Sequence, residues 1–132
     1  MIPEMKNTII ILSNQELVQW KLNIQGEKKI FIGEINGSII HSSHDYIRYI
    51  EDEFKFPKKC YDAWEAYIAF MKNLDWLDEE GYVLIINNFS NMLLYKSDIR
   101  GSILLSFLEN IIPYWKSLQC DSDKFFTVLL VE

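Results

Sequence analysis

The chain has 132 residues, with 13 basic and 19 acidic side chains and a formal net charge of −6. Its length supports one domain, its 49% of hydrophobic residues excludes disorder, and no apolar run is long enough to span a bilayer. The first residues lack a signal-peptide pattern and the acidic balance argues against direct nucleic-acid binding, so we expect a cytoplasmic protein with no membrane partner.

Residues 1–28 are predicted to form an N-terminal β-hairpin. The β-branched run 8–12 is followed by a polar break, and apolar residues then alternate with polar ones over 17–25. Alternation with a period of two is typical of a half-buried strand. Because two strands alone are marginally stable, we expect the hairpin to extend a sheet at one edge, antiparallel to its neighbour. We expect a monomer, and the alternative is a dimer formed through the open edge of this hairpin.

From residue 30 onward, strands are predicted to alternate with helices. Ser42 or Ser43 offers an N-cap for the first helix, and Pro113 should kink the last one. Strands that alternate with helices imply an α/β fold with a small parallel sheet and right-handed crossovers. The expected elements are a strand over 30–35, a helix from about 43 to 55, a helix over 61–77, a strand over 82–86, a helix over 97–116 and a strand over 125–131.

Groups that could support catalysis or hold a metal are scarce. His41 and His44 could share a metal ion with a neighbouring acid, but Ser-Ser-His-Asp is an ordinary helix-capping composition, and we adopt that interpretation. Cys60 and Cys120 are expected to be reduced thiols. Two lysines beside Cys60 would lower its pKa, yet no histidine is predicted near it, so a buried thiol is the better interpretation. We therefore predict no enzyme, no cofactor and no metal site.

The helix predicted over 61–77 carries a second, polar ridge opposite its apolar stripe. Tyr61 and Trp76 lie at its two ends with two carboxylates between them, a pattern typical of a protein-binding face. The alternative is that Trp76 packs under the following loop and the carboxylates are only solvated. The ridge residues are Asp62, Glu65, Ala69, Lys72 and Trp76.

Several short motifs follow one another in a familiar order. They are Ile35-Asn36-Gly37, Phe56-Pro57, Trp64-Glu65-Ala66 and Asp75-Trp76-Leu77. In order and spacing this stretch resembles the barstar family of ribonuclease inhibitors. The resemblance implies a barstar-like domain over 29–132, with a parallel sheet of about three strands flanked by helices, and it leaves 1–28 as an addition.

The resemblance also implies a function, a partner and a set of binding residues. The chain would be an inhibitor or immunity protein that occludes the active site of a basic ribonuclease or nuclease toxin with an acidic helix face. The alternatives are a barstar-like adaptor with a non-nuclease partner and an unrecognised small enzyme. By position, the family's binding face falls on Lys59, Tyr61, Ala63, Glu65, Ala69, Lys72 and Glu109.

The chain departs from the family's motif at four of these positions. Tyr61 stands where the family has glycine, Ala63 where it has asparagine, Glu65 where it has aspartate, and Ala69 where it has its central acid. Loss of the glycine suggests a different course of the loop or a different partner surface. Loss of the central acid means that we expect a toxin other than the ribonuclease barnase.

Overall fold

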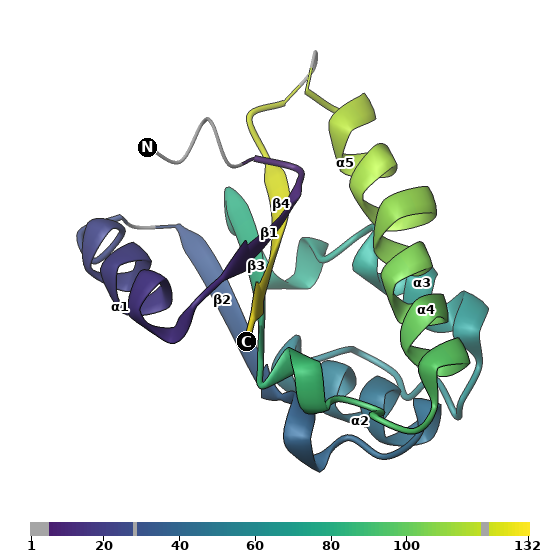
Figure 1. The fold of residues 1–132 in the computed structure, drawn as a ribbon. Helices are drawn as coiled ribbons and strands as arrows, with labels where there is room; N and C mark the ends of the chain where they lie inside the picture. The colour runs from purple at the N-terminus through teal and green to yellow at the C-terminus, as the bar shows by residue number, and fades with distance from the viewer. Residues whose placement is uncertain (1–5, 28, 120–121) are drawn as a thin grey trace.

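The computed structural model describes residues 6–27, 29–119 and 122–132 and places a parallel sheet between two layers of helices (Figure 1). The described strands lie in the order β1-β4-β3-β2, and each neighbouring pair is parallel. The α/β class and the parallel sheet are therefore as predicted, but the sheet has four strands rather than about three. The strands are β1 (Ile9–Leu12), β2 (Ile30–Asn36), β3 (Gly81–Asn87) and β4 (Phe125–Val131).

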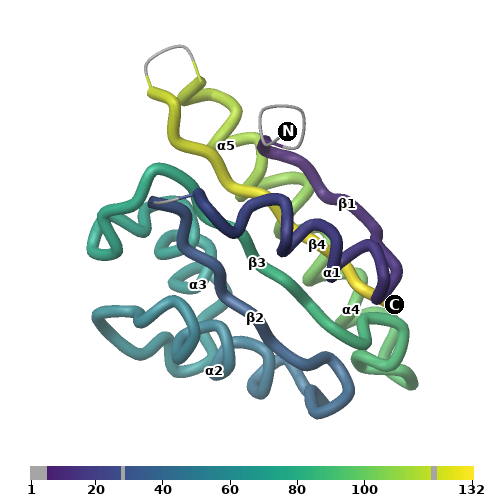
Figure 2. Tube along the Cα trace, turned by 90° about the vertical axis from the view of Figure 1, so that its left-hand side faces the viewer, coloured from purple at the N-terminus to yellow at the C-terminus, as the bar shows by residue number. Residues whose placement is uncertain are grey.

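Helices cover both faces of the sheet. In Figure 2 the helix α1 lies in front of the strands, and the other helices lie behind them. No helix in the described part of the chain is long and apolar enough to cross a bilayer. The α-helices are α1 (Asn14–Asn23), α2 (Ser43–Glu53), α3 (Trp64–Met71), α4 (Ser97–Leu105) and α5 (Ile112–Ser117), and a π-helical segment, η5 (Ser106–Ile111), joins the last two.

The two central strands supply both hydrophobic cores. Tyr82 and Leu84 of β3 face the core under α2, α3 and α5, whereas Val83 and Ile85 face a smaller core under α1. Every residue of β4 is buried. Burial on both faces explains why these strands are continuous apolar runs without alternation. Helix α1 contributes Leu17, Trp20 and Ile24 to the smaller core.

The predicted N-terminal hairpin is wrong. Most of its second strand is the helix α1, which begins at a capping box: the Glu16 N–H donates to Ser13 Oγ, and the Ser13 N–H donates to the Glu16 carboxylate. Spacing of three and four residues brings the buried side chains to one face of this helix, and Val18 and Leu22 stay exposed. Strand β1 does extend the sheet at one edge, but it is parallel to β4, because α1 intervenes before the chain returns to the sheet in β2.

The helix expected over 61–77 is shorter, and the last helix is interrupted. The α3 backbone ends at Met71, and the left-handed conformation of Leu74, with φ 57°, separates it from a 3₁₀ turn, η3 (Asp75–Leu77). The segment η5 ends two residues before Pro113, whose missing N–H cannot continue the regular hydrogen-bond ladder. The expected cap is confirmed: Ser42 Oγ accepts the Asp45 N–H at 3.0 Å.

Candidate functional site: the outer face of α3 and the turn before it

A groove of about 710 Å³ runs along the outer face of α3. Helix α3 supplies Glu65 and Ala69 to one wall, its C-cap residue Lys72 continues that wall, and Asn110 of η5 and Tyr114 of α5 belong to the other. The two helices stand side by side because the apolar stripes of both pack on the same face of the sheet. The ridge that the sequence singled out therefore borders a concave surface, which is the shape that a partner's side chains can enter.

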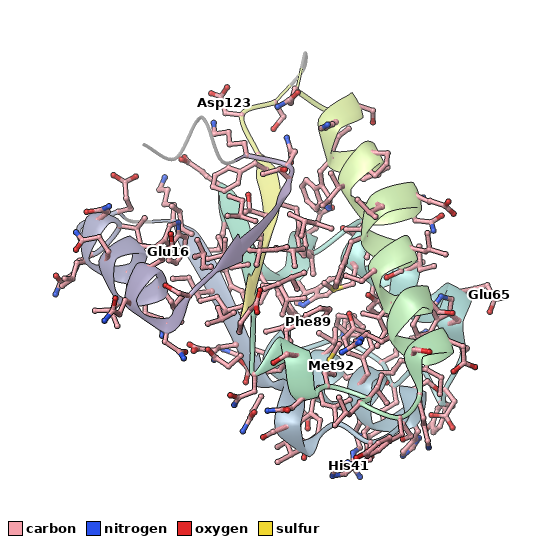
Figure 3. All side chains as sticks on the ribbon, in the orientation of Figure 1. Glu16, His41, Glu65, Phe89, Met92 and Asp123 are labelled. Atoms are coloured by element: carbon pink, nitrogen blue, oxygen red, sulfur yellow. The ribbon has the colours of Figure 1, made fainter. Side chains whose placement is uncertain are left out.

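Among the described residues, two carboxylates line this groove, those of Asp75 and Glu65, and Glu65 is the one that α3 supplies. It lies in the first turn of α3 and points away from the sheet, as Figure 3 shows. None of the ion pairs among the described residues includes Glu65. A carboxylate at this place is favoured by the positive end of the helix dipole and stays available to a cation from a partner.

Beyond Ala69, the groove lining includes the positive charge of Lys72 as well as the acid Asp75. The Lys72 ammonium lies 5.2 Å from the centre of the Tyr114 ring, a cation–π arrangement that holds it against the groove wall. Ala69, between Glu65 and Lys72 on the ridge, is exposed and contributes only its methyl group. The face is thus negative at Glu65 and of mixed charge beyond Ala69, where Lys72, Asp75 and Lys124 line the groove, and it is not uniformly acidic.

Trp76 lies away from this ridge, on η3. Its indole Nε1 donates to the Phe54 carbonyl oxygen at 2.8 Å, and its ring packs edge-on against Phe56 and Phe70. Because α3 ends at Met71 and Leu74 has a left-handed backbone, residues before and after Leu74 no longer lie on one helical ridge. Trp76 therefore packs away from the ridge, as the alternative held, but against residues that precede it in the chain and not under the following loop.

The turn that precedes α3 is tied to α2 at two points. Cys60 is buried, and its N–H donates to the carboxylate of the buried Glu51. Two residues further on, the Asp62 carboxylate contacts His44 Nδ1. Burial, together with the hydrogen bond to Glu51 and its negative charge, raises the pKa of the Cys60 thiol to about 12, so the thiol stays protonated. Between these two contacts Tyr61 is 85% exposed.

A chain of buried hydroxyl groups supports α3 from below. Tyr46 of α2 and Tyr67 of α3 share a hydrogen bond of 2.6 Å, and the Tyr67 hydroxyl lies 3.0 Å from Ser106 Oγ. Burial raises the pKa of both tyrosines above its ordinary value, so both hydroxyls remain neutral. Because these hydroxyls join α2, α3 and η5, they fix the distance between the two walls of the groove.

The remaining predicted residues lie around this face. Lys59 is exposed just before Cys60, and Ala63 is the N-cap of α3, where no side chain accepts a hydrogen bond. Glu109 is exposed on η5, one residue before Asn110 in the groove wall. Asn110, Tyr114 and Leu118 were missed, although their spacing of four residues marks one helical face.

The histidines form no metal cluster among the described residues, where no group of three or more potential ligands gathers. The His41 N–H donates to the Asp45 carboxylate at 3.0 Å, next to the cap of α2. His44 contacts Asp62 instead of a second histidine. Cys60 is a free thiol, and Cys120 lies outside the described residues.

Comparison with known proteins gives one match. The family model described as Barstar (barnase inhibitor) matches residues 30–130. No curated protein and no solved structure matches the chain. The matched range includes β2, β3, all of β4 but its last residue, every described α-helix except α1, and both the groove and the turn.

Proposed function

Because the chain belongs to the barstar family, we propose that it is an immunity protein that neutralises a ribonuclease-type toxin by covering its active site with the outer face of α3. A ribonuclease has to hold a phosphate backbone, so its active site is lined by cations. A carboxylate delivered into such a site pairs with those cations and excludes the substrate.

The unpaired carboxylate of Glu65 carries this proposal. It stands at the position where the family keeps an acid, it is exposed at the first turn of α3, and it borders the groove. Asp62 adds less charge, because it already contacts His44. With the basic Lys72 and the neutral Ala69, the rest of the face is not uniformly acidic. The cognate toxin should therefore present both a cation for Glu65 and a neutral or acidic group opposite Lys72, and barnase is not expected to be that toxin.

A ribonuclease inhibition screen tests the proposal. The purified protein is titrated into barnase and into a panel of ribonuclease toxin domains, and cleavage of a fluorogenic RNA is followed. We expect barnase to stay active and at least one toxin domain to lose its activity when inhibitor and enzyme are equimolar. Asp98→Lys serves as the matched control for Glu65→Lys, because Asp98, like Glu65, is an exposed acid in the first turn of a helix. If no ribonuclease is inhibited, the function is wrong.

The charge pattern of the face favours one second candidate. An exposed Lys59, a half-buried Lys72 and the methyl group of Ala69 would suit a partner that is not strongly basic. In that case the protein is a barstar-like adaptor that binds a protein without nuclease activity. A stable complex with a non-nuclease protein, formed through Glu65 and without effect on any ribonuclease of the panel, would favour this candidate.

A further inference from the structure

The turn before α3 has an unusual backbone for its sequence. Tyr61 and Asp62 are consecutive non-glycine residues with left-handed φ angles of 49° and 67°. The Ala63 N–H donates to the Cys60 carbonyl oxygen at 2.9 Å, which closes a four-residue turn around them. Two central residues with positive φ mark a turn of type I′, which selects glycine, asparagine or aspartate. Aspartate tolerates this conformation, whereas the Cβ and ring of a tyrosine make it costly.

The fold gains nothing visible from a tyrosine at this position. The side chain of Tyr61 is 85% exposed, so it buries little apolar surface in return for its strained backbone. Glycine would adopt the same φ without strain. The family's motif has glycine here, so the chain keeps a backbone that suits glycine and adds a large exposed side chain. Other non-glycine residues, Lys55 among them, also have left-handed φ angles. Tyr61 differs from Lys55 because its strained backbone carries a large exposed aromatic side chain beside the α3 face, and this combination is what points to a function for the side chain.

Helix α2 holds the strained turn in place. Its residues His44 and Glu51 are seven apart, so they lie on one face of the helix, two turns from each other. Glu51 holds Cys60 on one side of Tyr61, and His44 holds Asp62 on the other. A small hollow of about 80 Å³ between α2 and the turn is lined by His44, Glu51, Asp62 and Tyr61, among others. The two contacts keep Tyr61 pointing outward at the edge of the α3 face.

We propose that Tyr61 is a partner-recognition side chain peculiar to this chain, received by a recess on the partner ribonuclease, and that His44 and Glu51 are the positioning residues that present it. The proposal rests on the proposed function. Tyrosine is suited to this role because its ring offers a large apolar area, its hydroxyl offers a hydrogen bond, and few rotatable bonds have to be fixed. The turn, already fixed by α2, avoids most of the ordering cost of binding.

Tyr61→Gly and Tyr61→Ala separate recognition from strain. Both remove the side chain, but only glycine relieves the left-handed backbone. We expect Tyr61→Gly to raise the melting temperature by about 2–4 °C and Tyr61→Ala to leave it unchanged or lower. The probe is the toxin domain that the wild-type protein inhibits in the panel, with barnase as the reference ribonuclease. Both variants should bind this toxin domain about 30-fold more weakly, the usual effect of losing an aromatic anchor.

Two control variants match these changes elsewhere in the molecule. Lys55 has φ 54° and is exposed, so Lys55→Gly should raise the melting temperature without changing the affinity for the toxin domain. Tyr95 is 94% exposed, so Tyr95→Ala removes an exposed tyrosine from another surface and should leave the affinity unchanged.

The role of His44 is tested by a double-mutant cycle. His44→Ala should speed amide exchange at Ala63, which closes the turn, and should weaken binding about 5-fold, whereas His44→Gln, which can still hydrogen-bond Asp62, should restore both. In the Tyr61→Gly background, His44→Ala should have no further effect on binding, because there is no side chain left to present.

The outcomes distinguish this proposal from the proposed function. If the wild-type protein inhibits no ribonuclease, the proposed function fails and the recognition role of Tyr61 fails with it. If the wild-type protein inhibits a toxin domain and Tyr61→Gly inhibits it with the same affinity, only the role of Tyr61 is wrong. A melting temperature that falls in Tyr61→Gly would overturn the argument from strain.

Discussion

Replacement of Glu65 by lysine is the most direct test of the α3 face. The free protein should tolerate this change well, because the side chain is exposed and makes no ion pair among the described residues. A lysine in the first turn of α3 opposes the helix dipole, which costs about 1 kcal/mol of unfolding free energy. The fold should therefore survive, and the main effect should be on binding.

The magnitude follows from what a partner does to this carboxylate. In the free protein Glu65 is solvated, so its charge is worth little until a cationic site removes the water. Two charges 4 Å apart interact by about 4 kcal/mol at an effective dielectric constant of 20. Reversal turns this attraction into repulsion, and part of the difference is relieved by side-chain movement. We expect a loss of about 3 kcal/mol or more, which is a rise in Kd of at least about 100-fold.

Isothermal titration calorimetry and stopped-flow kinetics against the inhibited toxin domain measure the effect. The association rate of the wild-type protein should fall as salt is added, and that of Glu65→Lys should be slower and less sensitive to salt. Asp98→Lys should lose similar stability and keep its affinity, since both acids lie in the first turn of a helix. An unchanged Kd in Glu65→Lys would show that the interface does not include this face.

Three further predictions concern stability. Trp20→Ala should cost about 3–5 kcal/mol of unfolding free energy, measured by urea unfolding. Trp20→Phe should be nearly neutral, because the packing lost with the smaller ring is offset by removal of an indole N–H that is unpaired among the described residues. Cys60 should resist iodoacetamide at about pH 8, because its thiol stays protonated. The pKa of this thiol in the folded protein, about 12, exceeds the ordinary 9.0, so its contribution to stability should be lost as pH rises from 9.0 toward 12, which thermal melts would follow. Ala63→Asn should add about 1 kcal/mol in urea unfolding by capping α3.

The buried strands were readable from the sequence because their signal is local. The apolar runs of β3 and β4 are long, lie between polar loops, and permit only a strand that is buried on both faces. The N-cap was narrowed to Ser42 or Ser43, and the structure shows that it is Ser42. The barstar resemblance was carried by the same part of the chain, and the family match over residues 30–130 confirms it.

The N-terminal segment misled because two periods coincide in a short window. Val18, Trp20, Leu22 and Ile24 alternate with polar residues, yet Trp20 and Ile24 also share a helical face. The signal that would have decided for a helix is Ser-x-x-Glu at Ser13, a capping box. The parallel pairing of β1 with β4 could not be inferred, because β4 lies more than a hundred residues away in the chain.

The backbone of the turn at Tyr61 could not be predicted from the sequence, for a different reason. A missing glycine predicted either a changed backbone or a changed surface, and composition cannot separate the two. The left-handed φ angle of Tyr61 shows that the glycine-like backbone is kept, and the contacts from His44 and Glu51 depend on how α2 packs. Long-range contacts of this kind fix the shape of a binding face, and they therefore decide which partner the face suits.

The place of β1 in the sheet also sets a condition on how the molecule folds. Asn7, just before β1, accepts the Phe126 N–H at the start of β4 through its side-chain oxygen, across 119 residues of chain. Contacts between such distant residues close a very long loop, and chains with a high contact order fold slowly. Because β4 is synthesised after the other three strands, β1 lacks the strand it pairs with until β4 emerges, and the apolar face of α1 has Val83 and Ile85 of β3, but not yet β4, on the sheet side of its core. Completion of this sheet is therefore a late event, and an incomplete chain carries its aggregation-prone surfaces exposed until then.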